Sequence, residues 1–326
     1  MDVQIAFFTE SDFVGYVPRS NSGRTDTSWM AALNAYHCPF NRPLQGSFDI
    51  GIIIVPKKNP DLAFSFYERN KSNCTKWATM QEGPMDGWQD YSIVDQFQYL
   101  NLLNSVDIVF AHNDFDKRYY SGLLPHKKVS ILQSLMLEDA IPTTIEKDAQ
   151  KRTSCVIGGN FVKWYGGFDS YIVASEFEVP IYAPSMGRKQ TGEEMIDGLT
   201  HLPYMNWSEW IERLSHFKYA VHLMRTAAAG TFQMNASFLG IPCISYNTID
   251  TARICQPDLT IEVGDLEMGR RLAQKLKTDN DFYDHCSKVA NSNFLDNYSE
   301  IRFLERFQEA WSAVLQILTI KRGKTQ

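Results

Sequence analysis

Several features that define other protein classes are absent from this sequence of 326 residues. The six cysteines form no C-x-x-C pair, which excludes the usual zinc-ribbon and thiol-redox motifs. No His/Asp/Glu cluster has metal-ligand spacing, so we expect no obligatory metal. No apolar run is long enough to span a membrane. We therefore expect a globular protein whose cysteines are reduced core residues.

The chain also lacks an excess of basic residues. Its formal charge is −6 and its pI is about 5.7, which argues against strong, sequence-independent binding to nucleic acids. The N-terminal residues MDVQIAFFTE contain no basic segment followed by an apolar one, so they do not resemble a secretory signal. We expect a cytoplasmic location.

What the sequence does contain is an alternation of short apolar runs and helical patterns, which is typical of βαβ units around parallel sheets. The alternation pauses at a polar segment, 138–153, and then restarts. We predict an α/β protein with an N-terminal domain over 1–150 and a second domain over 151–297. An amphipathic helix over 298–318 begins a C-terminal segment, 298–326.

The most informative segment is Arg225–Pro242, which reads RTAAAGTFQMNASFLGIP. It predicts a strand exit, a loop of small residues, a helix of about ten residues and a Gly-x-Pro turn into the next strand. Small side chains allow a phosphate to approach the backbone at Gly230 and Thr231. A tight turn packed against a neighbouring element explains the same residues equally well.

This segment resembles the donor-binding region of glycosyltransferases of the GT-B fold, including phage-type DNA-modifying enzymes and family 4-like enzymes. Gly230 and Gly240-Ile-Pro242 match that pattern in register, but Ala227 and Asn235 stand where the two glutamates are usual. The resemblance implies two facing Rossmann-like doubly wound domains and a final helix that crosses back to the first domain. It also implies that Arg225 and Asn235 bind the donor, with Asn235 toward the ribose.

Two further segments of the second domain fit the resemblance. A strand ends at Ser185-Met-Gly187 and is followed by Arg188 and Lys189, a basic pair that would neutralise the donor diphosphate. A short strand over 201–205 leads into a helix capped near Asn206 or Ser208, and Tyr204 and Met205 would then hold the nucleobase. The alternatives are that Arg188 and Lys189 are solvated surface charges and that the short strand has a purely structural role.

The first domain should then bind the acceptor. Its first strand ends at Glu10 and Asp12, either of which is a candidate general base, and His112 is a third candidate at another strand end. The loop after the first strand is predicted to form an acceptor-binding lid. This lid carries Arg19, Arg24 and Asp26.

The resemblance leaves the acceptor open between two classes. One is hydroxymethylated pyrimidine in phage DNA, whose phosphates would contact Arg19, Arg24, Lys57, Lys58, Arg69 and Lys71. The other is a capsular or cell-surface glycan, for which an aromatic, uncharged cleft is expected. A UDP-sugar is the expected co-substrate, with no other cofactor, and the oligomeric state stays open. A nucleotide-sugar 2-epimerase and a non-catalytic nucleotide-binding protein are the alternative functions.

Overall fold

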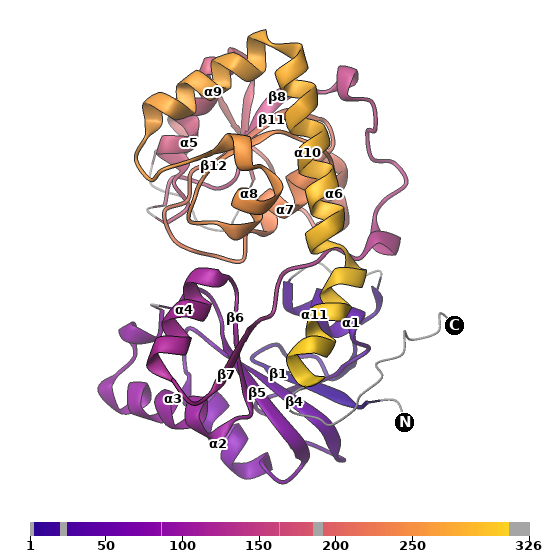
Figure 1. The fold of residues 1–326 in the computed structure, drawn as a ribbon, viewed down its shortest axis with the longest axis vertical. Coiled ribbons are helices and arrows are strands. Elements are labelled where there is room, and N and C mark those ends of the chain that lie inside the picture. The colour runs from indigo at the N-terminus through magenta and orange to yellow at the C-terminus, as the bar shows by residue number, and fades with distance from the viewer. Residues whose placement is uncertain (1–2, 20–24, 86, 163, 185–191, 313–326) are drawn as a thin grey trace. The chain divides into compact units, whose positions relative to one another are not determined.

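The computed structural model describes residues 3–19, 25–85, 87–162, 164–184 and 192–312. The chain divides into two compact units. Unit 1 contains the described residues of 1–137 together with helix α11, and unit 2 spans Glu138–Ser299 (Figure 1). Residues 138–150, which the sequence analysis assigned to the first domain, therefore belong to unit 2.

Unit 1 is built on a seven-stranded sheet in the order β2-β3-β1-β4-β5-β6-β7. All neighbouring strands are parallel except β2 and β3. The strands are β1 (Ile5–Thr9), β2 (Gly15–Tyr16), β3 (Tyr36–Pro39), β4 (Phe48–Val55), β5 (Cys74–Gln81), β6 (Ile108–Ala111) and β7 (Lys128–Ile131). The helices are α1 (Thr25–Ala32), α2 (Asp61–Asn70), α3 (Ile93–Ser105), α4 (Asp114–Leu123) and α11 (Glu300–Ser312), with a 3-10 turn, η2 (Gly87–Asp90).

Alternating side chains of the strands bury both faces of this sheet. One face packs against α2, α3 and α4 through a core that includes Phe8 and Trp77. On the other face, the Phe110 ring lies 6.2 Å from the rings of Phe307 and Trp311 of α11. A bidentate ion pair between Arg19 and Glu300 also ties α11 to the N-terminal part of the chain. The C-terminal helix is thus an integral layer of unit 1 (Figure 1).

Unit 2 contains a six-stranded, fully parallel sheet in the order β10-β9-β8-β11-β12-β13. This is the doubly wound order of a Rossmann domain. The strands are β8 (Thr153–Ile157), β9 (Ile181–Ala183), β10 (Leu199–His201), β11 (Phe217–His222), β12 (Cys243–Tyr246) and β13 (Thr260–Ile261). The helices are α5 (Gly167–Ala174), α6 (Trp207–Leu214), α7 (Thr231–Phe238), α8 (Asp250–Cys255), α9 (Leu266–Thr278) and α10 (Asn280–Tyr298). The 3-10 turns are η3 (Glu138–Ala140), η4 (Ala149–Lys151), η5 (Ser175–Phe177), η6 (Glu193–Met195) and η7 (Pro257–Leu259).

Helices cover both faces of this second sheet as well. Residues of α5, α9 and α10 share a core with one set of strand side chains, which includes Ile157 and Tyr219. Residues of α6 and α7 pack against the alternate set, which includes Val156 and Ala220. The predicted fold class, α/β with two Rossmann-like doubly wound domains, is confirmed.

Two predicted elements differ in the structure. Instead of one helix over 298–318, α10 ends at Tyr298 and α11 begins at Glu300, because Ser299 is extended at ψ 159° and serine favours a helix start. Residues 313–318 lie outside the described residues. The predicted bounds of the strand over 201–205 are wrong, because β10 covers Leu199–His201. Pro203 has no N–H to donate to a neighbouring strand.

Candidate functional site

In open α/β sheets, ligands bind beyond the carboxyl ends of the strands, where the strand order reverses. In unit 2 the order reverses between β8 and β11, so the flanking loops are 158–166 and 223–230. Two hydrogen bonds of Ser170 join these loops, because its Oγ donates to Gly166 O (2.8 Å) and accepts from Leu223 N (2.9 Å). The two loops at the switch point of unit 2 are therefore joined by hydrogen bonds.

Glycines make the close packing of these loops possible. Gly166 has φ +63°, and a Cβ on it would lie 1.9 Å from the backbone oxygen of Leu223. A Cβ on Gly167 would lie 2.3 Å from the backbone oxygen of Asn160. Both positions require glycine because backbone, not a flexible side chain, fills the space.

The N-terminus of α7 lies in the second flanking loop. Its cap residue Gly230 has φ +70°, and a Cβ there would meet Thr251 Oγ1 at 2.0 Å. Thr251 in turn donates a hydrogen bond to Gly230 O (2.8 Å). The predicted phosphate loop is thus also a tight turn packed on a neighbour, as the alternative interpretation held. The cap residue Gly230 has no side chain with which to cap α7, and the N-terminus of a helix attracts anions.

Arg225 projects from the same loop and is held by a carboxylate. Its Nη2 donates to Asp169 Oδ2 at 2.9 Å, and Tyr246 donates its hydroxyl to the same oxygen at 3.0 Å. Asp169 raises the pKa of Arg225 through this hydrogen bond, and burial raises the pKa of Tyr246 to about 12. The Arg225 side chain stays 60% exposed, so a permanent, oriented cation stands at the switch point.

Buried polar groups lie beneath this surface. Gln233 Nε2 donates to His222 Nδ1 at 3.0 Å, which leaves the proton of the neutral imidazole on Nε2. His222 Nε2, Gln233 Oε1, Asn235 Oδ1 and Asn160 Nδ2 are buried, and no hydrogen-bond partner is found for any of them within the described part of the chain. Such groups are costly unless a ligand or water satisfies them. Asn235, the predicted ribose ligand, is only 2% exposed.

His222 should make the stability of the protein fall in mild acid. Burial lowers the pKa of His222 from 6.5 to about 4, so the native state stays neutral where the unfolded chain already binds a proton. Its contribution is complete above pH 6.5 and is lost as the pH falls from 6.5 toward 4; at pH 5 the loss is about 2 kcal/mol. In urea denaturation, the difference in unfolding free energy between pH 7 and pH 5 should shrink by about this amount in His222→Asn. An unchanged difference would show that His222 is not the titrating group.

The remaining predicted donor residues are placed differently. Tyr204 is 82% exposed beyond the end of β10, whereas Met205 packs against the core beside α6. Asn206 caps α6 in a full capping box with Glu209, as predicted for this helix start. Arg188 and Lys189 lie outside the described residues.

In unit 1 the strand order reverses between β1 and β4. Glu10 and Asp12 follow β1 directly and are exposed, so both candidate bases flank this switch point. Strand β4 forms the other side of the switch point. Lys57 and Lys58 follow β4, and both are exposed. The structure therefore brings two carboxylates and two ammonium groups to the same edge of the sheet.

His112, the third candidate base, is less suited to that role. Its Nε2 lies 3.0 Å from Gln81 O and donates to it, so Nδ1 is the nitrogen able to accept a proton, and Nδ1 is buried. Burial, with a smaller effect of Lys57, lowers the pKa of His112 to about 4. The imidazole is neutral at pH 7, but its basic nitrogen does not face solvent.

The predicted acceptor lid is only partly described. Arg19 is bound to Glu300 of α11, with nitrogen–oxygen distances of 3.0 and 2.7 Å, and so anchors a helix. Arg24 lies outside the described residues, and Asp26 is half-buried in the first turn of α1. His37 of β3 was not predicted, because the short segment Tyr36–Pro39 gives a weak strand signal. This histidine stacks on Phe13 (4.0 Å) and bonds Thr9 Oγ1 (2.9 Å) beside the switch point.

Four of the six basic residues proposed to contact DNA phosphates are divided between two edges of the sheet of unit 1. Helix α2 runs from the carboxyl end of β4 to the amino end of β5, which separates its two termini along the sheet. Lys57 and Lys58 precede α2, whereas Arg69 and Lys71 lie at its other end, where Lys71 pairs with Glu68. That part of the prediction is corrected.

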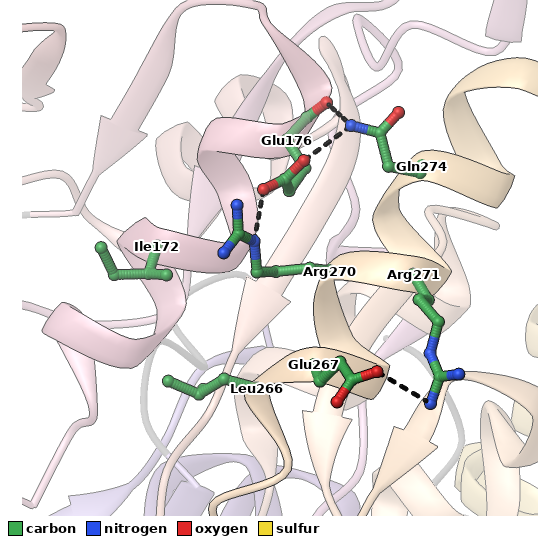
Figure 2. A pocket seen from close by; sticks show the side chains of 7 residues that line it. All are labelled: Ile172, Glu176, Leu266, Glu267, Arg270, Arg271 and Gln274. Atoms are coloured by element: carbon green, nitrogen blue, oxygen red, sulfur yellow. Dashed lines mark hydrogen bonds and ion pairs between the residues drawn. The ribbon is translucent and has the colours of Figure 1, made fainter.

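A groove of 490 Å³ lies on the helical layer of unit 2 (Figure 2). All its lining residues belong to α5, η5 or α9: Ile172, Glu176, Leu266, Glu267, Arg270, Arg271 and Gln274. Figure 2 shows Glu176 accepting hydrogen bonds from Arg270 Nε and Gln274 Nε2, the latter at 2.6 Å. The charged side chains of the groove already pair with one another. None of the lining residues belongs to a loop at the switch point.

The acidic, histidine and thiol side chains form no candidate metal site in the described part of the chain. Across the described ranges, no three His, Cys, Asp or Glu side chains are arranged to hold a metal ion. The chain has two D-x-D tripeptides, and both open helices: Asp116 accepts from Asn113 in α4, and Asp279 caps α10. Among the same residues, no helix is both long and apolar enough to cross a membrane.

Together, the two doubly wound units and the C-terminal helix that returns to unit 1 define the GT-B fold of glycosyltransferases. No family model and no curated protein matches the sequence. Among solved structures, the chain is similar to HepE of Anabaena in complex with UDP and glucose, at 10% identity, TM-score 0.68, over 95% of this chain and 100% of that one.

Two further structures show the same fold over almost the entire chain. Sucrose-phosphate synthase from Thermosynechococcus elongatus is similar at 10% identity with a TM-score of 0.67, over 95% of this chain and 99% of that one. An alpha-glucosyltransferase in complex with UDP and a 13-mer DNA containing an HMU base is similar at 13% identity with a TM-score of 0.64, over 95% and 100%. The predicted GT-B resemblance is thereby confirmed for the fold.

Proposed function

We propose that this protein is a nucleotide-sugar-dependent glycosyltransferase. The observation that carries the proposal is the switch point of unit 2, where the exposed cation Arg225, held by Asp169, belongs to the loop that leads into the N-terminus of α7. A cation and a helix N-terminus together suit a diphosphate. The UDP bound in two of the similar structures supports a uridine nucleotide as the carrier of the sugar.

The proposed reaction transfers the sugar to a hydroxyl group of an acceptor. Asp12 or Glu10 of unit 1 takes the hydroxyl proton, the hydroxyl oxygen bonds to the anomeric carbon, and the bond from that carbon to the diphosphate breaks. Negative charge then develops on the leaving diphosphate, where Arg225 and the amides of α7 stabilise it. Of the three candidate bases, the two carboxylates are favoured because the basic nitrogen of His112 is buried.

Binding of the nucleotide tests this function directly. In a thermal-shift experiment, UDP should raise the melting temperature more than ADP, GDP or CMP, since a ligand of the native state stabilises it. Release of UDP from UDP-glucose and related UDP-sugars in the presence of EDTA would then test metal independence. If no nucleotide shifts the melting temperature, the transferase function is rejected. A cytoplasmic location stays a prediction that fractionation of expressing cells would check.

Asn235 is proposed to contact the ribose through its buried, unsatisfied Oδ1. One neutral hydrogen bond contributes about 1 kcal/mol, so Asn235→Ala should weaken binding of UDP by about fivefold in calorimetric titration. Asn101→Ala, on the exposed face of α3, is the matched control and should bind UDP normally. Equal affinity of wild type and Asn235→Ala would remove Asn235 from the donor site.

A further inference from the structure

Unit 2 exposes two large aromatic side chains at its switch point. Trp164 is 43% exposed in the loop that follows β8, and Phe168 is 62% exposed in the first turn of α5. Large aromatic side chains lose much hydrophobic free energy when they remain in water, so two of them at a ligand-binding edge indicate a surface that a ligand covers.

The loop that carries Trp164 makes several contacts through its described residues. Asn160, 1% exposed, accepts a hydrogen bond from Val162 N (3.3 Å), and Tyr165 N donates to Val162 O (3.0 Å). Gly159 packs against the Tyr165 ring, and Gly166 packs against the loop that follows β11. The described residues Val162 and Tyr165 are therefore held by hydrogen bonds, which reduces the ordering that binding would require.

The overall charge of unit 2 disfavours a polyanion. Unit 2 carries 21 acidic and 15 basic residues over 138–299. The nearest exposed cation with a described position in the adjoining loop, Arg225, is paired with Asp169 next to Phe168. In unit 1, the lysines and arginine around α2 are divided between the two edges of the sheet. DNA would require several phosphates to be neutralised together.

We propose that Trp164 and Phe168 form a stacking surface for a pyranose ring of a neutral acceptor glycan. The apolar C–H face of a sugar ring suits an aromatic face, and an uncharged sugar requires no clustered cations. The inference rests on the proposed transferase function and names the class of its acceptor.

The test is saturation-transfer NMR on the full chain in the presence of UDP. Maltohexaose, cellohexaose and chitohexaose serve as neutral probes, and a 13-base-pair DNA duplex containing hydroxymethyluracil is the competing acceptor. We expect saturation transfer to at least one hexasaccharide, at least about tenfold weaker binding of it by Trp164→Ala, and partial retention by Trp164→Phe. Phe97→Ala, which removes a ring that is 63% exposed from α3 in unit 1, should bind like wild type.

The outcomes separate this inference from the proposed function. No transfer to any hexasaccharide, equal binding by wild type and Trp164→Ala, or binding of the DNA alone would overturn the glycan inference. Each sample is also titrated with UDP, and Trp164→Ala should keep wild-type affinity for it. UDP binding without glycan binding rejects only the inference, whereas Trp164-dependent glycan binding without binding of any nucleotide rejects the transferase.

Discussion

Gly166→Ala should lower the free energy of unfolding by about 2–4 kcal/mol, the largest stability effect that we expect from a single methyl group. The residue has φ +63°, which alone costs an alanine about 1–2 kcal/mol. Its Cβ would also lie 1.9 Å from Leu223 O, and this backbone atom belongs to the other loop of the switch point. Relief of the clash must separate the two loops, so we also expect weaker binding of UDP.

Urea denaturation of the full chain and titration with UDP measure the two effects. Gly122→Ala is the matched control: it lies within α4, nothing stands within 4 Å of its added Cβ, and alanine favours a helix. That variant should be as stable as wild type or more stable, by up to about 1 kcal/mol. Wild-type stability of Gly166→Ala would contradict the close packing of Gly166 against Leu223.

Arg225→Ala should weaken binding of UDP by about 10- to 100-fold, the largest functional effect that we expect. A hydrogen bond to a charged phosphate contributes about 1.5–3 kcal/mol, and Asp169 already holds the guanidinium in place. The side chain is mostly exposed, so the free energy of unfolding should change by less than about 1 kcal/mol. Arg225→Lys should restore only part of the affinity, because an ammonium lacks the planar fork of donors.

Calorimetric titration at two salt concentrations tests this role, since loss of a phosphate contact should also reduce the dependence on salt. The control is Arg271→Ala, an equally exposed arginine on α9 whose guanidinium lies 3.8 Å from Glu267. Its affinity for UDP should match that of wild type. If Arg225→Ala and Arg271→Ala bind UDP equally well, Arg225 has no part in the donor site.

The sequence predicted the fold because that prediction depended on local signals. Buried strands such as 50–55 are continuous apolar runs, and an asparagine such as Asn113 favours a helix start, where it caps α4. Shorter or mixed segments escaped recognition. Strand β3 has only four residues, and α10 carries a polar, weakly periodic sequence whose helical state depends on packing against α7, α8 and α9.

The candidate site was harder to predict because its partners are distant in the chain. Arg19 was assigned to the acceptor, but its bidentate partner Glu300 is 281 residues away. Similarly, the pairing of Arg225 with Asp169 joins two loops that only the order of the strands brings together. A single sequence shows which residues follow strands, but not which of these loops become neighbours.

Because α11 belongs to unit 1, the two units can complete their folding at different times during synthesis. Unit 2 is one continuous stretch of chain, so it can fold as soon as residues 138–299 have left the ribosome. Unit 1 leaves first, yet the face of its sheet around Phe110 stays uncovered until Phe307 and Trp311 arrive. The N-terminal half of the protein is therefore the last to mature, and a nascent chain halted before α11 would expose an apolar surface to chaperones.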